Sequence, residues 1–296
     1  MKTNSILKIA VLFAVILIAS CTKDNNDNVG VFTAADIQTS AKLDQATNDL
    51  SDIIDDQYFT ENPTGKTVSP TEASSLPPCV TVTRTFTLTN WTRRVDFGTA
   101  GCAMPNGAIL RGAIIMTGSL PYTSTGYVIT YSFDNFRYND FLVQGNRTIT
   151  RSLGTSTYQA NIHPIWVMDM NMTFTNATGV YTRVGSRTRE CVEGYTTVVW
   201  TDNVYVITGA WTTTFPNGYT HTNTISSTAP IRVRLNCDYR VVSGVVNITR
   251  PNHTAVLDYG AGTCDNVATL SIDGGTPIAF TFSQLELIYK KNVQKF

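Results

Sequence analysis

The residues of this chain with the most specific chemistry are its cysteines. Four of the six bracket two similar stretches, one between Cys79 and Cys102 and one between Cys237 and Cys264. Each stretch runs through a strand rich in Val and Thr to an apolar-Asp-aromatic-Gly sequence and then to the closing cysteine, with 22 residues enclosed in the first and 26 in the second. This similarity indicates an internal duplication.

The duplication predicts how these cysteines pair. Four cysteines in an exported chain allow three pairings, and two related units favour the one in which each unit closes its own bond, Cys79 with Cys102 and Cys237 with Cys264. Loops of this length correspond to about 3 kcal/mol of stabilisation each in the chain-entropy description. Cys191 is left over as a thiol. It could be reactive or intermolecular, but we expect it to be inert and buried, because it lies in an alternating strand without a neighbouring His.

The sixth cysteine, Cys21, follows a secretory signal. Lys2 and Lys8 flank a short polar start, and the unbroken apolar run of 11 residues over 9–19 is shorter than a membrane-spanning helix requires. The run ends in Ile-Ala-Ser-Cys, which resembles the lipobox of bacterial lipoproteins, where the cysteine is acylated and becomes the new N-terminus. The resemblance implies a signal peptide over 1–20 and a permanent lipid anchor on Cys21. The alternative is an ordinary signal peptide cleaved nearby.

The segment over 21–31 is polar and acidic, and we expect it to be a flexible tether. Its Lys-Asp pair and the acids that follow look like the export signal of surface lipoproteins in the Bacteroidota phylum. That resemblance implies attachment to the outer membrane, on its periplasmic face or at the cell surface.

An acidic amphipathic helix is predicted over 32–61, followed by a linker rich in Pro, Gly, Ser and Thr over 62–78. Thr33 and Asp36 have the spacing of a capping box. The helix could be a partner-docking or coiled-coil segment, but we favour a helix packed on the β domain with its acidic face in solvent, because its apolar stripe is too short for a sustained heptad. The stripe consists of Leu43, Ala46, Leu50, Ile53, Ile54 and Tyr58.

Beyond Cys79 the hydrophobic period becomes two, most clearly over 80–89, 127–133 and 231–235, which is typical of strands with one dry and one wet face. Thr accounts for 37 of the 218 residues from Cys79 onward, and Thr favours strands over helices. Tight turns are expected at Asn106-Gly107, Asn217-Gly218 and Asp273-Gly274.

We therefore predict an all-β fold over 79–296, an antiparallel meander or sandwich-like sheets in two related halves, with one N-terminal amphipathic helix. At typical strand lengths it would contain about 14 to 18 strands. The duplicated units span 79–118 and 237–275, and the sequence does not decide between one β domain and two.

Composition limits the partners. The zero net charge conceals a segregation, with 10 acidic against 3 basic residues over 21–78 and 12 acidic against 17 basic residues over 79–296; the other two basic residues, Lys2 and Lys8, lie in the signal segment. The basic excess is modest and has no dense Lys/Arg cluster, so nucleic-acid binding is disfavoured.

Several residue patterns that could do chemistry have simpler structural explanations. Asp96-Phe97-Gly98 has the letters of a kinase metal-binding triplet, but the pattern recurs at Asp258-Tyr259-Gly260, so we expect two turns in which Asp accepts local backbone N–H groups. The thioethers in a Trp/Met stripe could bind Cu(I), but period two predicts the core face of a strand. That stripe is Trp166, Met168, Met170, Met172 and Phe174.

No pattern indicates a catalytic residue, a cofactor or a metal. His163, His221 and His253 stand apart, without the spacing of a zinc site, and no G-x-S-x-G sequence is present. A glycosidase would require a pair of carboxylates about 5 to 9 Å apart, and no paired-acid motif occurs. We therefore expect a protein that is not an enzyme.

Two functions remain in contention. The first is a non-catalytic envelope lipoprotein, structural or protein-binding. The alternative is a surface glycan-binding module in which Trp91, Trp200 and Trp211 would stack on sugar rings, although such aromatics more often fill β cores. Exposed rings would favour the glycan module and buried rings the first function.

Four segments, 95–102, 128–136, 203–209 and 257–266, resemble a family of uncharacterised Bacteroidota outer-membrane or surface lipoproteins. The likeness extends over most of the mature chain. It implies an envelope lipoprotein with no known activity, and it supplies no functional residues. From the two functions above, we expect an envelope protein or a glycan as partner. Cys191 falls where the pattern of that family lacks a cysteine.

Overall fold

In the part of the chain that the structure describes, one helix is followed by 15 strands. The computed structural model describes residues 32–61, 76–121, 126–197, 199, 201–237 and 239–281. The predicted signal peptide, Cys21, the tether and most of the linker lie outside these ranges. The elements are α1 (Ala34–Glu61), β1 (Thr81–Phe86), β2 (Asn90–Asp96), β3 (Cys102–Ala103), β4 (Ile109–Ser119), β5 (Tyr127–Tyr138), β6 (Phe141–Gly154), β7 (His163–Asn176), β8 (Gly179–Glu193), β9 (Val204–Thr214), β10 (Thr220–Ile225), β11 (Ile231–Arg234), β12 (Val241–Arg250), β13 (His253–Ala261), β14 (Val267–Ile272) and β15 (Ile278–Thr281).

All strands belong to one antiparallel sheet. Its order is β1-β2-β4-β5-β6-β7-β8-β9-β10-β12-β13-β14-β15, with β3 beside β4, and with β11 between β9 and β12. Neighbours in the sheet are therefore almost always neighbours in the chain. The all-β class, the antiparallel meander and the number of strands are as predicted, and the strands form one continuous sheet.

The helix begins where the sequence indicates. The backbone N–H of Thr33 donates to Asp36 Oδ2 and the backbone N–H of Asp36 donates to Thr33 Oγ1, both at 3.1 Å, which is the reciprocal pattern of a capping box. The predicted apolar stripe from Leu43 to Tyr58 is buried throughout. The predicted helix over 32–61 is confirmed.

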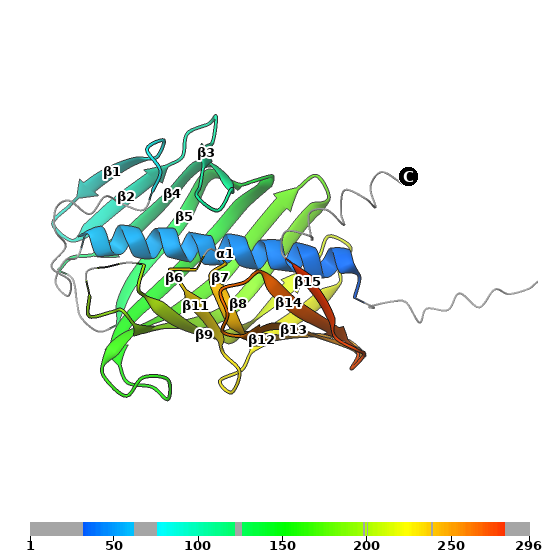
Figure 1. Cartoon of the computed structure of the whole chain (residues 1–296). Coiled ribbons are helices and arrows are strands. Elements are labelled where there is room, and N and C mark those ends of the chain that lie inside the picture. Colours follow the sequence, from blue (N-terminus) through cyan, green and yellow to red (C-terminus); the bar gives the residue numbers. More distant parts are fainter. Residues whose placement is uncertain are drawn as a thin grey trace, which may run out of the picture.

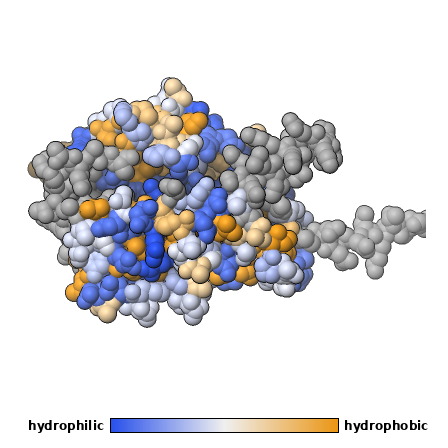
Figure 2. Space-filling model, in the orientation of Figure 1, coloured by the Kyte–Doolittle hydropathy of each residue, from blue (hydrophilic) through white to orange (hydrophobic). Residues whose placement is uncertain are grey.

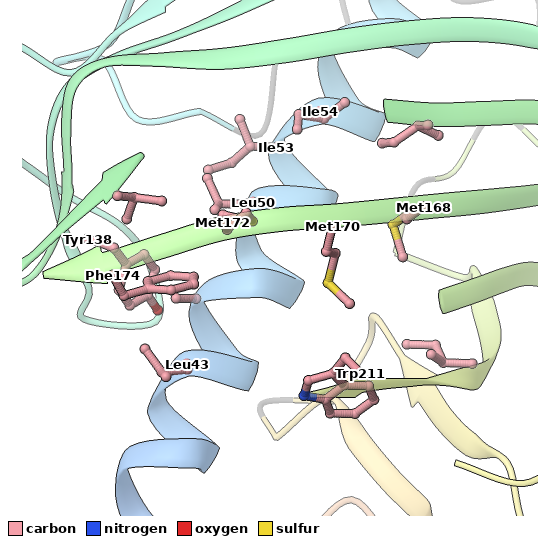
Figure 3. Packing of buried hydrophobic residues seen from close by; sticks show 14 of the residues in the cluster. Leu43, Leu50, Ile53, Ile54, Tyr138, Met168, Met170, Met172, Phe174 and Trp211 are labelled. Carbon is pink, nitrogen blue, oxygen red and sulfur yellow. The ribbon is translucent and has the colours of Figure 1, made fainter. Parts of the chain in front are cut away.

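One face of the sheet, here called the inner face, packs against α1, and the opposite face is called the outer face (Figure 1). Side chains from β2 through to β12 contact this single helix, so the sheet curves around it. The centre of the core is formed by the Trp/Met stripe of β7, whose Met168, Met170 and Met172 are buried. Met170 points toward Trp211 (Figure 3), and Ser51 Oγ on α1 donates to Met168 Sδ at 3.4 Å. The prediction of a core strand there is confirmed.

The two duplicated units lie toward opposite ends of the sheet. In each, a disulfide joins the segment before a hairpin to the chain after its second strand: Cys79, before β1, pairs with Cys102 of β3, and Cys237, before β12, pairs with Cys264 in the loop after β13. The predicted pairing is confirmed. The Asp-aromatic-Gly turns also match, because the first carboxylate oxygen of Asp96 and of Asp258 accepts the N–H of the glycine two residues later, each at 2.8 Å.

The strand β1 departs from the predicted dry and wet faces. It pairs only with β2 among the described strands, and its side chains are mostly exposed. Phe86 and Leu88, predicted to face the core, are 55% and 99% exposed. An edge strand has too few neighbours to bury its apolar face fully, although Val80 and Val82 still pack against the core.

On the side of the molecule that carries α1, hydrophilic and hydrophobic residues are interspersed in small groups (Figure 2). Within the described ranges no helix has the length and apolar character needed to span a membrane.

Candidate functional site

Seven arginine side chains are buried on the inner face, between the sheet and α1. On β8, Arg183, Arg187 and Arg189 lie on the same side of the strand as the buried Tyr181 and Cys191. A buried guanidinium without a partner is strongly unfavourable, so the partners of these side chains determine whether the fold is stable. The seven, each no more than 7% exposed, are Arg93, Arg147, Arg151, Arg183, Arg187, Arg189 and Arg250.

Carboxylates of α1 supply most of the partners. Asp44 Oδ1 lies 2.8 Å from Arg183 Nη1 and 2.5 Å from Arg187 Nη2. Arg187 also donates through Nη1 to Asn48 Oδ1 at 2.9 Å. One carboxylate therefore pairs with two guanidinium groups. Asn48, one turn further along the helix, accepts another hydrogen bond from Arg187.

A second group of ion pairs lies two turns beyond Asp44. Asp52 is 2.6 Å from Arg189 Nη2 through Oδ1 and 2.7 Å from Arg240 Nη1 through Oδ2. Asp55 is 3.3 Å from Arg151 Nη1 and 3.4 Å from Arg189 Nη1. Three separate segments of the β domain are thus attached to two aspartates that lie three residues apart on the helix.

Both ends of α1 are fixed to the sheet as well. Asp36, which caps the helix, also pairs with Arg250 on β12 at 3.1 Å. At the other end, Arg93 Nη1 on β2 donates to the carbonyl oxygen of Gln57 and to its Oε1, the latter at 3.0 Å. The helix is therefore bound along its whole length.

Aromatic rings also contact the guanidinium groups. The guanidinium carbon lies 3.7 Å from the ring centroid of Trp211 for Arg187, and 3.8 Å from that of Tyr205 for Arg189. Cation–π contacts of this kind are strongest where water is excluded. Ring and carboxylate together replace the hydration that these cations lose on burial.

Arg147 on β6 is an exception. Among the described residues it has no carboxylate within ion-pair distance; its Nη2 is 3.8 Å from Met168 Sδ and its guanidinium is 5.3 Å from the ring centroid of Tyr131. Burial lowers the pKa of this guanidinium.

Two titratable groups at the helix–sheet contact have shifted pKa values. Burial raises the pKa of Asp49 to about 6, against the opposing hydrogen bonds from the Tyr138 hydroxyl and from Asn106 Nδ2. Burial, assisted by two neighbouring arginines, lowers the pKa of His221 to about 3. Neutral His221 lies with Nε2 3.2 Å from Ser40 Oγ on α1.

The prediction that the acidic face of α1 is solvated is therefore wrong. Its aspartates face the sheet, because the sheet places arginines on the inner face. The charge segregation in the sequence has the same origin: the acidic N-terminal part and the Arg-rich β part are two sides of one buried interface. This arrangement uses the interior charges for cohesion of the fold.

The aromatics predicted to contact a ligand are not at the surface. Trp91 is 1% and Trp211 2% exposed, and Trp91 Nε1 donates to the Tyr127 hydroxyl at 2.5 Å. The prediction that a sugar stacks on Trp91 or Trp211 is therefore wrong, because both rings project to the inner face that α1 covers. Trp200 lies outside the described residues.

The remaining sequence candidates have structural surroundings. Cys191 is buried and belongs to neither disulfide, as predicted. His163 Nε2 lies 2.9 Å from Glu190 Oε2, and His253 Nδ1 lies 2.8 Å from Asp273 Oδ2. Across the described part of the chain, no three His, Cys, Asp or Glu side chains are grouped as metal ligands would be.

The outer face contains an open cavity of about 410 Å³ that sequence reasoning did not find. It lies over β9, β11, β12 and β13 and is lined by Tyr158, Val206, Arg232, Ser243, Gly244 and Asp258, among others. The Tyr158 hydroxyl donates to the carbonyl oxygen of Ser227 at 2.8 Å, and Arg232 pairs with Glu193. No local sequence signal places these residues together, because they come from five separate segments.

No protein-family model, no curated protein and no solved structure matches this chain.

Proposed function

We propose that this chain is a lipid-anchored, non-catalytic protein of the bacterial cell envelope, a structural or protein-binding module held at the outer membrane through Cys21. The order of segments supports this. Only 12 residues separate the lipobox-like Cys21 from the first residue of α1, Ala34, and a chain of that length spans at most about 40 Å. The helix that anchors the sheet is thus next to the membrane attachment.

The observation that carries the proposal is the contrast between the two faces of the sheet. The inner face is covered by α1, and most of its buried guanidinium groups form ion pairs with the helix. The outer face presents one row of uncharged side chains across its central strands, Val128, Thr150, Val167, Thr188 and Thr208, which are paired in register from β5 to β9. A rigid β surface with an uncharged central row suits contact with another protein.

The anchor is tested by metabolic labelling. We expect a palmitate analogue to label the wild-type chain and not a Cys21→Ser variant, and we expect the variant to leave the membrane fraction. Equal labelling of both chains would contradict the anchor.

The protein contact is tested by photo-crosslinking in intact cells. A photoreactive residue in place of Val167, which is 36% exposed on the outer face, is expected to give one defined adduct with an envelope protein. The control places the same residue at Leu88, which is 99% exposed beyond the end of β1. An adduct from Leu88 but none from Val167 would refute binding through the outer face.

A second candidate function, a surface glycan-binding module, is favoured by one observation, the cavity on the outer face, whose lining includes Tyr158, Arg232, Ser243 and Asp258. The buried Trp91 and Trp211 no longer support it, so it rests on that cavity alone.

A further inference from the structure

The cavity on the outer face lies where the sheet is irregular. The pairing of β11 with β12 shifts register between Arg232 and Val233, and that of β12 with β13 shifts between Ser243 and Val245. Bulges re-aim side chains and are frequent beside functional sites. Both shifts here involve residues that line the cavity. The two bulges therefore shape the cavity wall.

A glycine fixes one wall of the cavity. Gly244 has φ +110°, and a Cβ there would lie 2.2 Å from the carbonyl oxygen of Pro230. Only glycine allows β12 to come this close to the segment before β11. Gly244 and Pro230 both line the cavity, so its shape is built into the backbone.

The duplicated turn provides an internal reference for the acid in the cavity. In the first unit, the second carboxylate oxygen of Asp96 pairs with Arg94 at 3.1 Å. In the second unit, the position of Arg94 is occupied by Val256, and Asp258 makes no ion pair within the described ranges. Of two equivalent turns, one has a neutralised carboxylate and the other keeps a carboxylate oxygen available beside a cavity.

Other polar groups of the cavity are available in the same way. Ser243 makes no side-chain hydrogen bond to any described residue, and Arg232 uses only Nη2 in its pair with Glu193. The cavity thus combines a carboxylate acceptor, guanidinium donors and a hydroxyl with the ring of Tyr158.

We propose that this cavity binds a neutral saccharide unit; the inference rests on the second of the two proposed functions. Sugar hydroxyls both donate and accept, so they can donate to Asp258 and accept from Arg232, while the apolar face of a sugar ring suits Tyr158. An anion is disfavoured, because Asp258 and Glu193 outnumber the one guanidinium. The volume falls within the roughly 300 to 1,000 Å³ of small-molecule sites.

The test uses the full chain in a detergent without a sugar head group. Saturation-transfer NMR is recorded with a panel of neutral disaccharides, cellobiose, maltose, mannobiose and chitobiose, and with polygalacturonate fragments as acidic probes. We expect at least one neutral disaccharide to bind saturably. Asp258→Asn keeps an acceptor for the turn but removes the charge, and should weaken binding roughly tenfold or more.

Asp96→Asn is the matched control, since it makes the same change in the equivalent turn at the other end of the sheet and should leave binding unchanged. Ser243→Leu should abolish binding by filling the cavity. If Asp258→Asn does not fold, Ser243→Ala replaces it, because that hydroxyl has no described protein partner and its loss should still weaken binding.

The outcomes separate the inference from the function it rests on. Neutral-sugar binding that survives both cavity substitutions would overturn the site and leave the glycan-binding module standing. Absence of binding across the whole panel would overturn both. Binding of the acidic fragments alone would overturn the neutral ligand class.

Discussion

Asp44 of α1 and Arg183 of β8 lie 2.8 Å apart in the interior, although 139 residues separate them in the sequence. Arg183 has no exposed side-chain surface and Asp44 keeps 16% of its own. The pair joins the acidic N-terminal part of the chain to the Arg-rich sheet. It is therefore typical of the buried ion pairs that hold α1 against the sheet.

Replacing Asp44 should destabilise the protein strongly. Asp44→Asn would leave Arg183 and Arg187 buried without their shared carboxylate, and removing one partner of a buried pair typically costs about 3 to 5 kcal/mol. Denaturant unfolding followed by tryptophan fluorescence, with the disulfides intact, measures the loss. Asp169→Asn, on an exposed position of the outer face of β7, is the control and should change stability by less than about 0.5 kcal/mol. Equal effects of the two substitutions would contradict the role of Asp44.

His221 should make the protein sensitive to acid. Its pKa falls from 6.5 to about 3 on folding, so the unfolded chain takes up a proton well before the native state does. The stability contributed by neutral His221 is fully present above pH 6.5 and is lost as the pH falls toward 3. The loss should reach about 3 kcal/mol near pH 4. His221→Gln should flatten this part of the curve, whereas His253→Gln, at an exposed hairpin, should not. Equal slopes for the wild type and His221→Gln between pH 6.5 and 4 would rule the effect out.

Asp49 should act in the opposite direction. Its pKa rises from 3.8 to about 6, so the native state holds this proton more tightly and stability falls as the pH rises between these values. Asp49→Asn keeps an acceptor for the Tyr138 hydroxyl and removes the buried charge. We expect the substitution to raise the free energy of unfolding by about 1 kcal/mol at pH 7, allowing for partial exposure of Asp49, and to give no gain at pH 4. A loss of stability at pH 7 would show that the carboxylate is required in its charged form.

The second disulfide should stabilise by constraining the unfolded chain. Replacing Cys237 and Cys264 together by Ser is expected to lower the free energy of unfolding by about 3 kcal/mol.

Cys191 should react with a thiol reagent only after unfolding, since it is buried. Rapid labelling of Cys191 in the native protein, at the rate of an exposed thiol, would contradict this account of its surroundings.

Local patterns were sufficient to predict much of this fold. The capping box at Thr33 and Asp36 depends on residues three apart, and the turn at Asp273-Gly274 depends on two adjacent residues. The disulfides followed from the duplication, which is itself a repeated local pattern. In a meander each strand pairs mainly with its chain neighbour, so a correct local interpretation carries most of the topology.

The contacts of α1 could not be predicted in the same way, because they join residues distant in the sequence, for example 36 positions apart for Gln57 and Arg93 and 188 for Asp52 and Arg240. Polar residues of an amphipathic helix ordinarily face water, and the aspartates of α1 are buried only because the sheet supplies arginines. One signal was present: Arg183, Arg187 and Arg189 share strand parity with Tyr181 and Cys191, and a face that carries these apolar residues is a buried face. The outer cavity combines five segments and had no signal at all.

The account makes α1 an integral part of the core, which leaves ligand contact to the outer face. Hydrogen–deuterium exchange of the full chain tests this most directly. We predict that the amides over 43–58 exchange only through global unfolding, with the same free energy of opening as the central strand β7. Rapid exchange of these amides while β7 remains protected would contradict the account, because α1 would then be a detachable cover and the arginine-lined inner face would be open to ligands.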